Sequence, residues 1–105
     1  MVFKEDIIQQ IKLDFKDSAD KVVEILSNAI SKTDYLKTDR IIRCIIFLAK
    51  GDIDKLEKYI DNAIFDPRDV MLWAEYENPD NDNFSHKRIR DFNKTFDKCT
   101  ENVKE

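Results

Sequence analysis

Apolar residues recur at three- and four-residue spacing along most of the chain, which is the spacing of one face of an α-helix. The first apolar stripe spans residues 3–15 and the second spans residues 19–30. The next segment, residues 38–50, is apolar on almost every side at its centre. A helix of that kind usually lies in the middle of a small bundle. The pattern therefore predicts a helical hairpin at about residues 3–32, followed by a buried helix.

After this buried helix, a glycine, two capping residues and a proline mark where one helix ends and the next begins. Gly51, the only glycine, fits the left-handed position just past a helix end. Asp52 follows directly and can cap the next helix. At Asp66-Pro67 a capping side chain precedes a proline in the first helical position, which is a strong helix start. These signals predict a second hairpin at about residues 38–65 and a further helix that begins at the proline.

The C-terminal third of the chain contains a polar stretch and one more apolar stripe. The residue before a proline avoids helical conformation, so the helix from Pro67 should end before Asn78-Pro79. Residues 78–83 are polar and are expected to form a loop. The stripe beyond them is narrow, as in a helix that packs on a neighbour, and consists of Ile89, Phe92, Phe96, Cys99 and Val103. We expect a C-terminal helix pair at about residues 67–103, whose last helix packs on its own domain or forms a homodimer.

The first hairpin aligns with the second when the chain is shifted so that residue 3 meets residue 37. The alignment gives nine identical pairs over the 28 positions from residue 3 to residue 30. Chance would give about two or three for a fixed-period match of this composition. Asn28-Ala29-Ile30, for example, meets Asn62-Ala63-Ile64. This self-similarity predicts a duplicated helical hairpin.

The second hairpin contains an ordered set of residues that is similar to a known repeat. Gly51-Asp52 stands at the turn, and the residues that follow are Leu56, Tyr59, Ile60, Ala63 and Asp66-Pro67. With the period of 34, this order resembles the tetratricopeptide repeat family over residues 37–67. The motif is degenerate, since Cys44 stands where the family prefers glycine. The resemblance implies a hairpin stack that presents a groove to another protein, whereas the alternative is a compact bundle without a groove.

Composition agrees with an all-α domain. The chain has 105 residues, of which 42% are hydrophobic and 38% are charged, as expected for one globular domain. One glycine and two prolines are too few for the many turns of an all-β fold. We therefore expect five to six helices, arranged as the duplicated hairpin plus the C-terminal pair in a compact bundle or a short hairpin stack.

Charge and cysteine content narrow the class of protein. The net charge of −4 and the pI of about 5.0 argue against a large nucleic-acid footprint, which would normally be basic. The N-terminus has charges where a signal peptide would be apolar. The longest apolar stretch, residues 41–49, is interrupted by Arg43 and is too short to span a bilayer. Cys44 and Cys99 are expected to be buried free thiols, and the expected location is cytoplasmic.

No group of residues has the spacing of a catalytic, cofactor or metal site. A single glycine excludes the glycine-rich nucleotide-binding loops. His86 is the only histidine, so a site of several imidazole ligands cannot form. The acidic stretch that starts at Asp80 resembles the opening of a calcium loop, but Ser85 replaces its turn glycine. We therefore expect no catalytic residue, no cofactor and no metal.

Arg43 and a short aromatic segment form the first candidate interaction surface. Arg43 lies inside the most apolar helix, and a buried arginine needs a partner. The candidate partners are Asp39, Asp69 and Glu75. Aromatic residues with a charged rim are typical of recognition surfaces, so the candidate surface comprises Trp73, Glu75, Tyr76 and Arg43. The alternative is that these aromatic residues lie at the edge of the core.

The function predicted from these patterns is that of a non-catalytic protein-interaction module or a small regulatory module. Its partner would be another protein, and no membrane is expected. The alternative is a nucleic-acid-binding domain that uses the basic cluster Lys87, Arg88, Arg90, Lys94 and Lys98. A second alternative is a small enzyme with a site near Arg43 and Glu75.

Overall fold

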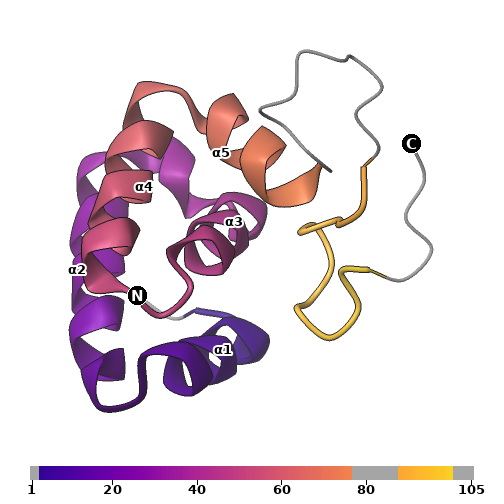
Figure 1. Cartoon of the computed structure of the whole chain (residues 1–105). Helices are drawn as coiled ribbons and strands as arrows, with labels where there is room; N and C mark the ends of the chain where they lie inside the picture. The colour runs from indigo at the N-terminus through magenta and orange to yellow at the C-terminus, as the bar shows by residue number, and fades with distance from the viewer. Residues whose placement is uncertain (1–2, 77–87, 101–105) are drawn as a thin grey trace.

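The computed structural model describes residues 3–76 and 88–100, and within them the regular structure is helical apart from one antiparallel bridge between Tyr76 and Arg88 (Figure 1). The predicted all-α fold class is confirmed. The helices are α1 (Glu5–Phe15), α2 (Ala19–Lys32), α3 (Asp39–Ala49), α4 (Ile53–Phe65) and α5 (Pro67–Glu75). Two short 3₁₀ turns, Lys16–Ser18 and Asp34–Lys37, connect α1 to α2 and α2 to α3. None of the described helices is long and apolar enough to cross a bilayer.

The helix boundaries follow the internal alignment of the sequence. The shift that places residue 3 on residue 37 also places α1 on residues 39–49, which are the bounds of α3. The same shift moves α2 to residues 53–66, where α4 spans residues 53–65. Two helical hairpins of equal register therefore form the larger part of the fold, as the alignment predicts.

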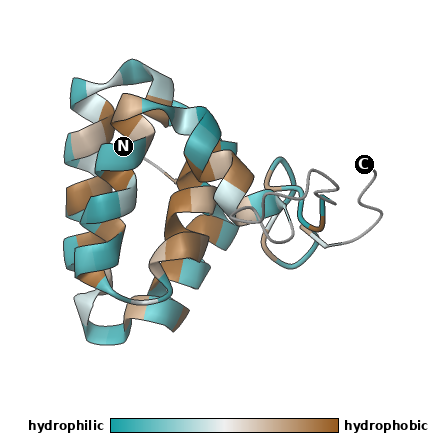
Figure 2. Ribbon diagram, turned by 45° about the horizontal axis from the view of Figure 1, so that its top comes forward, coloured by the Kyte–Doolittle hydropathy of each residue, from teal (hydrophilic) through white to brown (hydrophobic). Residues whose placement is uncertain are grey.

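α3 lies at the centre of the fold because it is apolar on nearly every side. It contacts α1, α4 and α5, and its buried apolar side chains are Ile41, Ile42, Cys44, Ile45, Ile46 and Ala49. The other helices are amphipathic, and Figure 2 shows hydrophobic and hydrophilic bands side by side along them. Their apolar faces join α3 in one core that includes Ile7, Ile11, Leu26, Leu56 and Val70.

Local signals set the helix ends as expected. The side chain of Asp52 accepts the backbone N–H groups of Asp54 and Lys55 at 2.9 and 3.3 Å, and Asp66 likewise accepts the N–H of Arg68 at 3.0 Å. Such caps satisfy backbone donors that the first helical turn leaves free. Gly51 has φ 81°, which confirms the predicted left-handed conformation.

The predicted C-terminal helix is wrong for residues 88–100, which we call the strap. These residues form turns and irregular structure. The N–H groups of Ile89 and Arg90 bond to the carbonyl of Glu75 at 2.8 and 3.1 Å, and other strap N–H groups bond to side chains of the helices. A helix needs its N–H groups for its own carbonyls, and tertiary bonds outweigh its weak intrinsic propensity here. The last residues of the predicted helix, including Val103, lie outside the described residues.

Candidate interaction site

Two arginines of α3 connect it to its neighbours by ion pairs. Arg40 and Arg43 are three residues apart, which places them on the same side of the helix. Arg40 donates to both carboxylate oxygens of Glu75 on α5, with Nε 3.1 Å from Oε2. Arg43 donates from Nε and Nη2 to Asp6 on α1 at 2.9 and 3.0 Å. Bidentate pairs of this kind combine charge with fixed geometry. They therefore fix the positions of α1 and α5 relative to α3.

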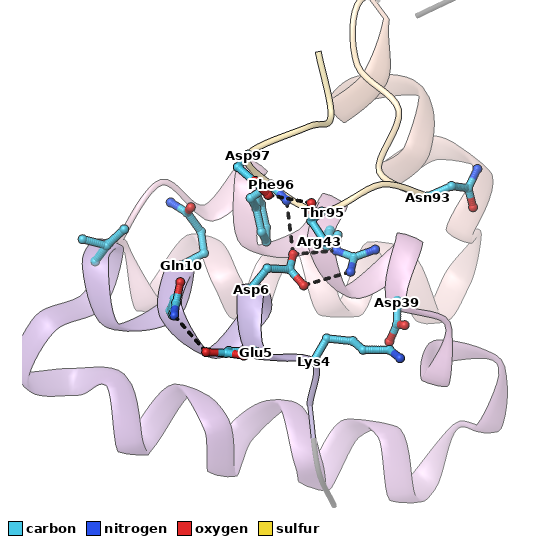
Figure 3. A pocket seen from close by; sticks show the side chains of 12 residues that line it. Lys4, Glu5, Asp6, Gln10, Asp39, Arg43, Asn93, Thr95, Phe96 and Asp97 are labelled. Carbon is cyan, nitrogen blue, oxygen red and sulfur yellow. Dashed lines mark hydrogen bonds and ion pairs between the residues drawn. The ribbon is translucent and has the colours of Figure 1, made fainter. Parts of the chain in front are cut away.

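The same two carboxylates bind the backbone of the strap. Glu75 Oε2 accepts the N–H of Phe92 at 2.8 Å, and Asp6 Oδ2 accepts the N–H of Phe96 at 3.1 Å. Arg43 Nη1 in turn donates to the carbonyl of Phe92 at 3.1 Å. Figure 3 shows Asp6 between the guanidinium of Arg43 and the backbone of Phe96. Residues far apart in sequence thus form one polar junction beneath the strap.

Aromatic packing anchors the strap beside this junction. Phe92 is fully buried, and its ring centroid lies 5.4 Å from that of Phe47 on α3 and 5.7 Å from that of Phe96. The guanidinium of Arg90 lies 4.3 Å from the Phe47 centroid, within range of a cation–π contact. Phe92 therefore enters the core, as does Cys99, while Phe96 packs against it partly buried.

The predicted burial of Arg43 is confirmed, but its three candidate partners are wrong. Asp39 and Asp69 form no ion pair with Arg43, and Glu75 pairs instead with Arg40 and Arg88. The partner is Asp6, because the packing of α1 on α3 brings its first turn over the Arg43 side chain. Asp6 precedes an apolar stripe as an ordinary first-turn acid, so no local signal in the sequence singled it out.

The predicted surface of Trp73, Glu75, Tyr76 and Arg43 is not a free surface. Glu75 and Arg43 are buried in the ion pairs described above. Trp73 is half-buried, with its ring centroid 6.1 Å from that of Tyr59, and Tyr76 is also half-buried. Trp73 therefore lies at the edge of the core, which is the alternative that the sequence left open for it.

The basic cluster is divided between internal contacts and solvent. Arg88 pairs with Glu75 and Asp91 at 3.4 and 2.9 Å. Arg90 donates to the carbonyl of Ala74 at 3.0 Å. Lys98 is exposed and Lys94 is half-buried, while Lys87 lies outside the described residues. The two arginines hold the strap on the protein, so they do not extend a basic face toward solvent.

An open hollow of about 960 Å³ lies between the first half of α1 and the strap (Figure 3). The Asp6–Arg43 pair and Phe96 line its inner part, and the residues around them are Lys4, Glu5, Gln9, Gln10, Leu13, Asp39, Asn93, Thr95 and Asp97. The space shows that the strap does not fill the groove between itself and α1.

An apolar patch lies apart from the strap, at the end of α4. Phe65 is 90% exposed, Tyr35 is 47% exposed and Ile64 is 40% exposed. The hydroxyl of Tyr35 donates to the carbonyl of Ile64, which joins the turn before α3 to α4. The sequence analysis missed this patch. Its signal was the run Ala63-Ile64-Phe65, because consecutive helical residues cannot all face one core.

The buried thiols are poor nucleophiles. Cys44 and Cys99 are free and buried, as predicted. Burial raises the pKa of the Cys44 thiol, and the nearby charge of Glu75 raises it further. Since the thiolate is the reactive form, Cys44 stays protonated at neutral pH. Among the described residues, no three His, Cys, Asp or Glu side chains are grouped as metal ligands.

Acid should weaken the junction through Asp6. Burial raises the pKa of Asp6, but hydrogen bonds from Arg43 and the Phe96 N–H outweigh it and hold this pKa below the ordinary 3.8. A carboxylate with a lowered folded-state pKa stabilises the protein above pH 3.8, and this contribution is lost as pH falls through the folded pKa.

Urea unfolding at a series of pH values measures this loss. The free energy of unfolding of the wild type should fall as the pH drops below about 4, and the fall should be shallower in Asp6→Asn. Parallel curves for the two proteins would show that Asp6 does not contribute.

Comparison with protein-family models, with characterised proteins and with solved structures finds no match to this chain. The tetratricopeptide resemblance accordingly stays a sequence prediction, and the function is proposed below from the geometry of the strap junction and the apolar patch.

Proposed function

We propose that this chain is a non-catalytic protein-interaction module that binds another protein through the patch formed by Tyr35, Ile64 and Phe65. The observation that supports this proposal is the 90% exposure of Phe65. Exposed aromatic and aliphatic side chains that cluster on a soluble domain are typical of a surface that a partner covers.

The geometry of the patch suits binding because its backbone is already ordered. Phe65 ends α4, and Asp66 both caps α5 and pairs with Arg68 at 3.1 Å. The bond from Tyr35 to the Ile64 carbonyl holds the turn before α3 against the same helix end. A preordered surface loses less conformational entropy on binding. Aromatic anchors beside an exposed arginine, here Arg68, are also the residue types that dominate binding energy at interfaces.

The other two functional classes have weaker support. A nucleic-acid binder would use Arg88 and Arg90, but both arginines are engaged with Glu75, Asp91 and the Ala74 carbonyl. An enzyme near Arg43 and Glu75 would need these groups to reach a substrate, yet both are buried and satisfied by hydrogen bonds. The free thiols are consistent with a reducing compartment, so we further propose a cytoplasmic location.

A photo-crosslinking amino acid at position 65, expressed in the source cell, tests the proposal. The expected result is one discrete adduct of higher mass, identified by mass spectrometry. The matched control places the same amino acid at Lys21, which is exposed on α2 and lies outside both the patch and the hollow beside α1. Phe65→Ser should keep the melting temperature of the wild type, since substitutions of exposed side chains seldom change stability. The absence of an adduct, or the same adducts from positions 65 and 21, would count against the patch.

A further inference from the structure

We propose that the strap occupies, within its own chain, a peptide-binding groove on α1, α3 and α5, and that a partner segment of the same chemistry displaces it. The partner segment is a non-helical peptide with two phenylalanines four residues apart. This inference rests on the junction beneath the strap and does not depend on the patch at Phe65.

The strap is held in the way that a bound peptide is held. Side chains of the helices accept hydrogen bonds from its backbone at two places four residues apart: Glu75 accepts the N–H of Phe92, and Asp6 accepts the N–H of Phe96. Arg43 donates to the carbonyl of Phe92 between these two points. Backbone bonds supply affinity in peptide recognition, while side-chain pockets supply specificity. The specific element here is Phe92, which is fully buried beside Phe47.

The groove is complete without the strap. Its two carboxylates are each paired with an arginine of α3, Glu75 with Arg40 and Asp6 with Arg43. When the strap leaves, both carboxylates keep an ionic partner, so no unpaired charge is left buried. The helices form most of the core, including Ile7, Leu26 and Leu56, and the strap adds Phe92 and Cys99 to it. Since the helices keep most of the core, we expect departure of the strap to be a local opening rather than a loss of the fold.

The strap also fits its groove incompletely. The hollow of about 960 Å³ between α1 and strap residues 93–97 is open to solvent (Figure 3). The strap itself forms turns rather than a helix or a strand. A longer partner segment with the same two phenylalanines would make the same bonds and could fill the hollow as well, which gives it an advantage over the strap.

Binding of a synthetic peptide to the full-length chain tests the proposal. The peptide has the sequence of residues 88–100 and carries a fluorescent label. In the wild type the tethered strap competes at an effective concentration on the order of millimolar, so the peptide should bind weakly. In the full-length F92A/F96A variant the strap has lost its aromatic anchors, while the helices that form the groove are unchanged in sequence. The peptide should bind this variant at least about tenfold more tightly than it binds the wild type.

Two altered peptides control for specificity. A peptide with alanine in place of both phenylalanines should bind neither protein. A peptide that lacks the residue equivalent to Lys94, so that the phenylalanines are three apart, should bind the variant at least about tenfold more weakly than the original peptide. If the F92A/F96A variant keeps the helical circular-dichroism signal of the wild type and does not bind the original peptide, the proposal is wrong. Self-association of the variant without peptide binding also overturns it, because the occupant would then be a second copy.

Amide hydrogen exchange of the wild type provides the second measurement if F92A/F96A fails to fold. The N–H groups of Phe92 and Phe96 should exchange at least about tenfold faster than those of Ile45 and Ile46 in α3, since the strap opens while the helices stay intact. Equal protection of the two sets would mean that the strap opens only when the whole chain unfolds, and the proposal would be overturned.

Discussion

Replacing Arg43 with alanine should lower the free energy of unfolding by about 3 kcal/mol, because removal of one partner from a buried ion pair leaves the other charge uncompensated. Arg43 is buried and bonds three oxygen atoms at once: both carboxylate oxygens of Asp6 and the carbonyl oxygen of Phe92. Its loss affects α1, α3 and the strap together. Urea unfolding followed by circular dichroism measures the change.

Arg40→Ala is the matched control for Arg43→Ala. Arg40 is on the same side of α3 and makes an equivalent bidentate pair, but its side chain is partly exposed. Its partner Glu75 also keeps Arg88 and the Phe92 N–H after the substitution. The expected loss is therefore smaller than for Arg43. An unchanged midpoint in Arg43→Ala, or equal losses in the two variants, would contradict the role assigned to the Asp6–Arg43 pair.

Gly51→Ala should cost about 3 kcal/mol, close to the upper end of what a single unfavourable backbone conformation costs. Gly51 has φ 81°, which a residue with a side chain rarely adopts. A Cβ atom added there would also lie 2.6 Å from the carbonyl oxygen of Asp14. That oxygen belongs to the backbone of α1, so the turn between α3 and α4 would have to move away from α1. Thermal and urea unfolding should both show the loss.

Lys50→Gly at the neighbouring position provides the opposite test. Lys50 is also in the left-handed region, with φ 50°, but it has a side chain. Glycine adopts this conformation without the steric cost, so this variant should gain up to about 1 kcal/mol. For Gly51→Ala itself, a stability equal to that of the wild type would contradict the close approach of residue 51 to the Asp14 carbonyl on α1.

The positions of α1 to α5 were predictable because their signals are local. The apolar spacing of each helix, the cap at Asp52 and the Asp66-Pro67 start depend only on residues a few positions apart. The internal alignment also predicted a duplicated hairpin, and α3 begins and ends where α1 does after the shift. The left-handed conformation of Gly51 was predictable for the same reason, since glycine is the residue most often found in that conformation just past a helix end.

The strap could not be predicted because its local pattern is that of a helix. Phe92, Phe96 and Cys99 stand at helical spacing, yet residues 88–100 form turns. The N–H groups that a helix would use internally are instead bonded by Glu75 and Asp6. These acceptors are 17 and 90 residues away along the chain. A short stretch of sequence around the strap therefore does not show that a distant carboxylate will take the N–H in place of a helical carbonyl.

The sequence by itself determined that this chain is all-α, where α1 to α5 lie, and that Arg43 must be buried with a partner. Only the tertiary structure decided which carboxylate that partner is, what conformation the strap takes, and that Phe65 is left in solvent. The physical reason is the range of the interactions. Helix periodicity, caps and turns are set within a few residues, whereas an ion pair such as Asp6–Arg43 exists only after α1 has packed on α3.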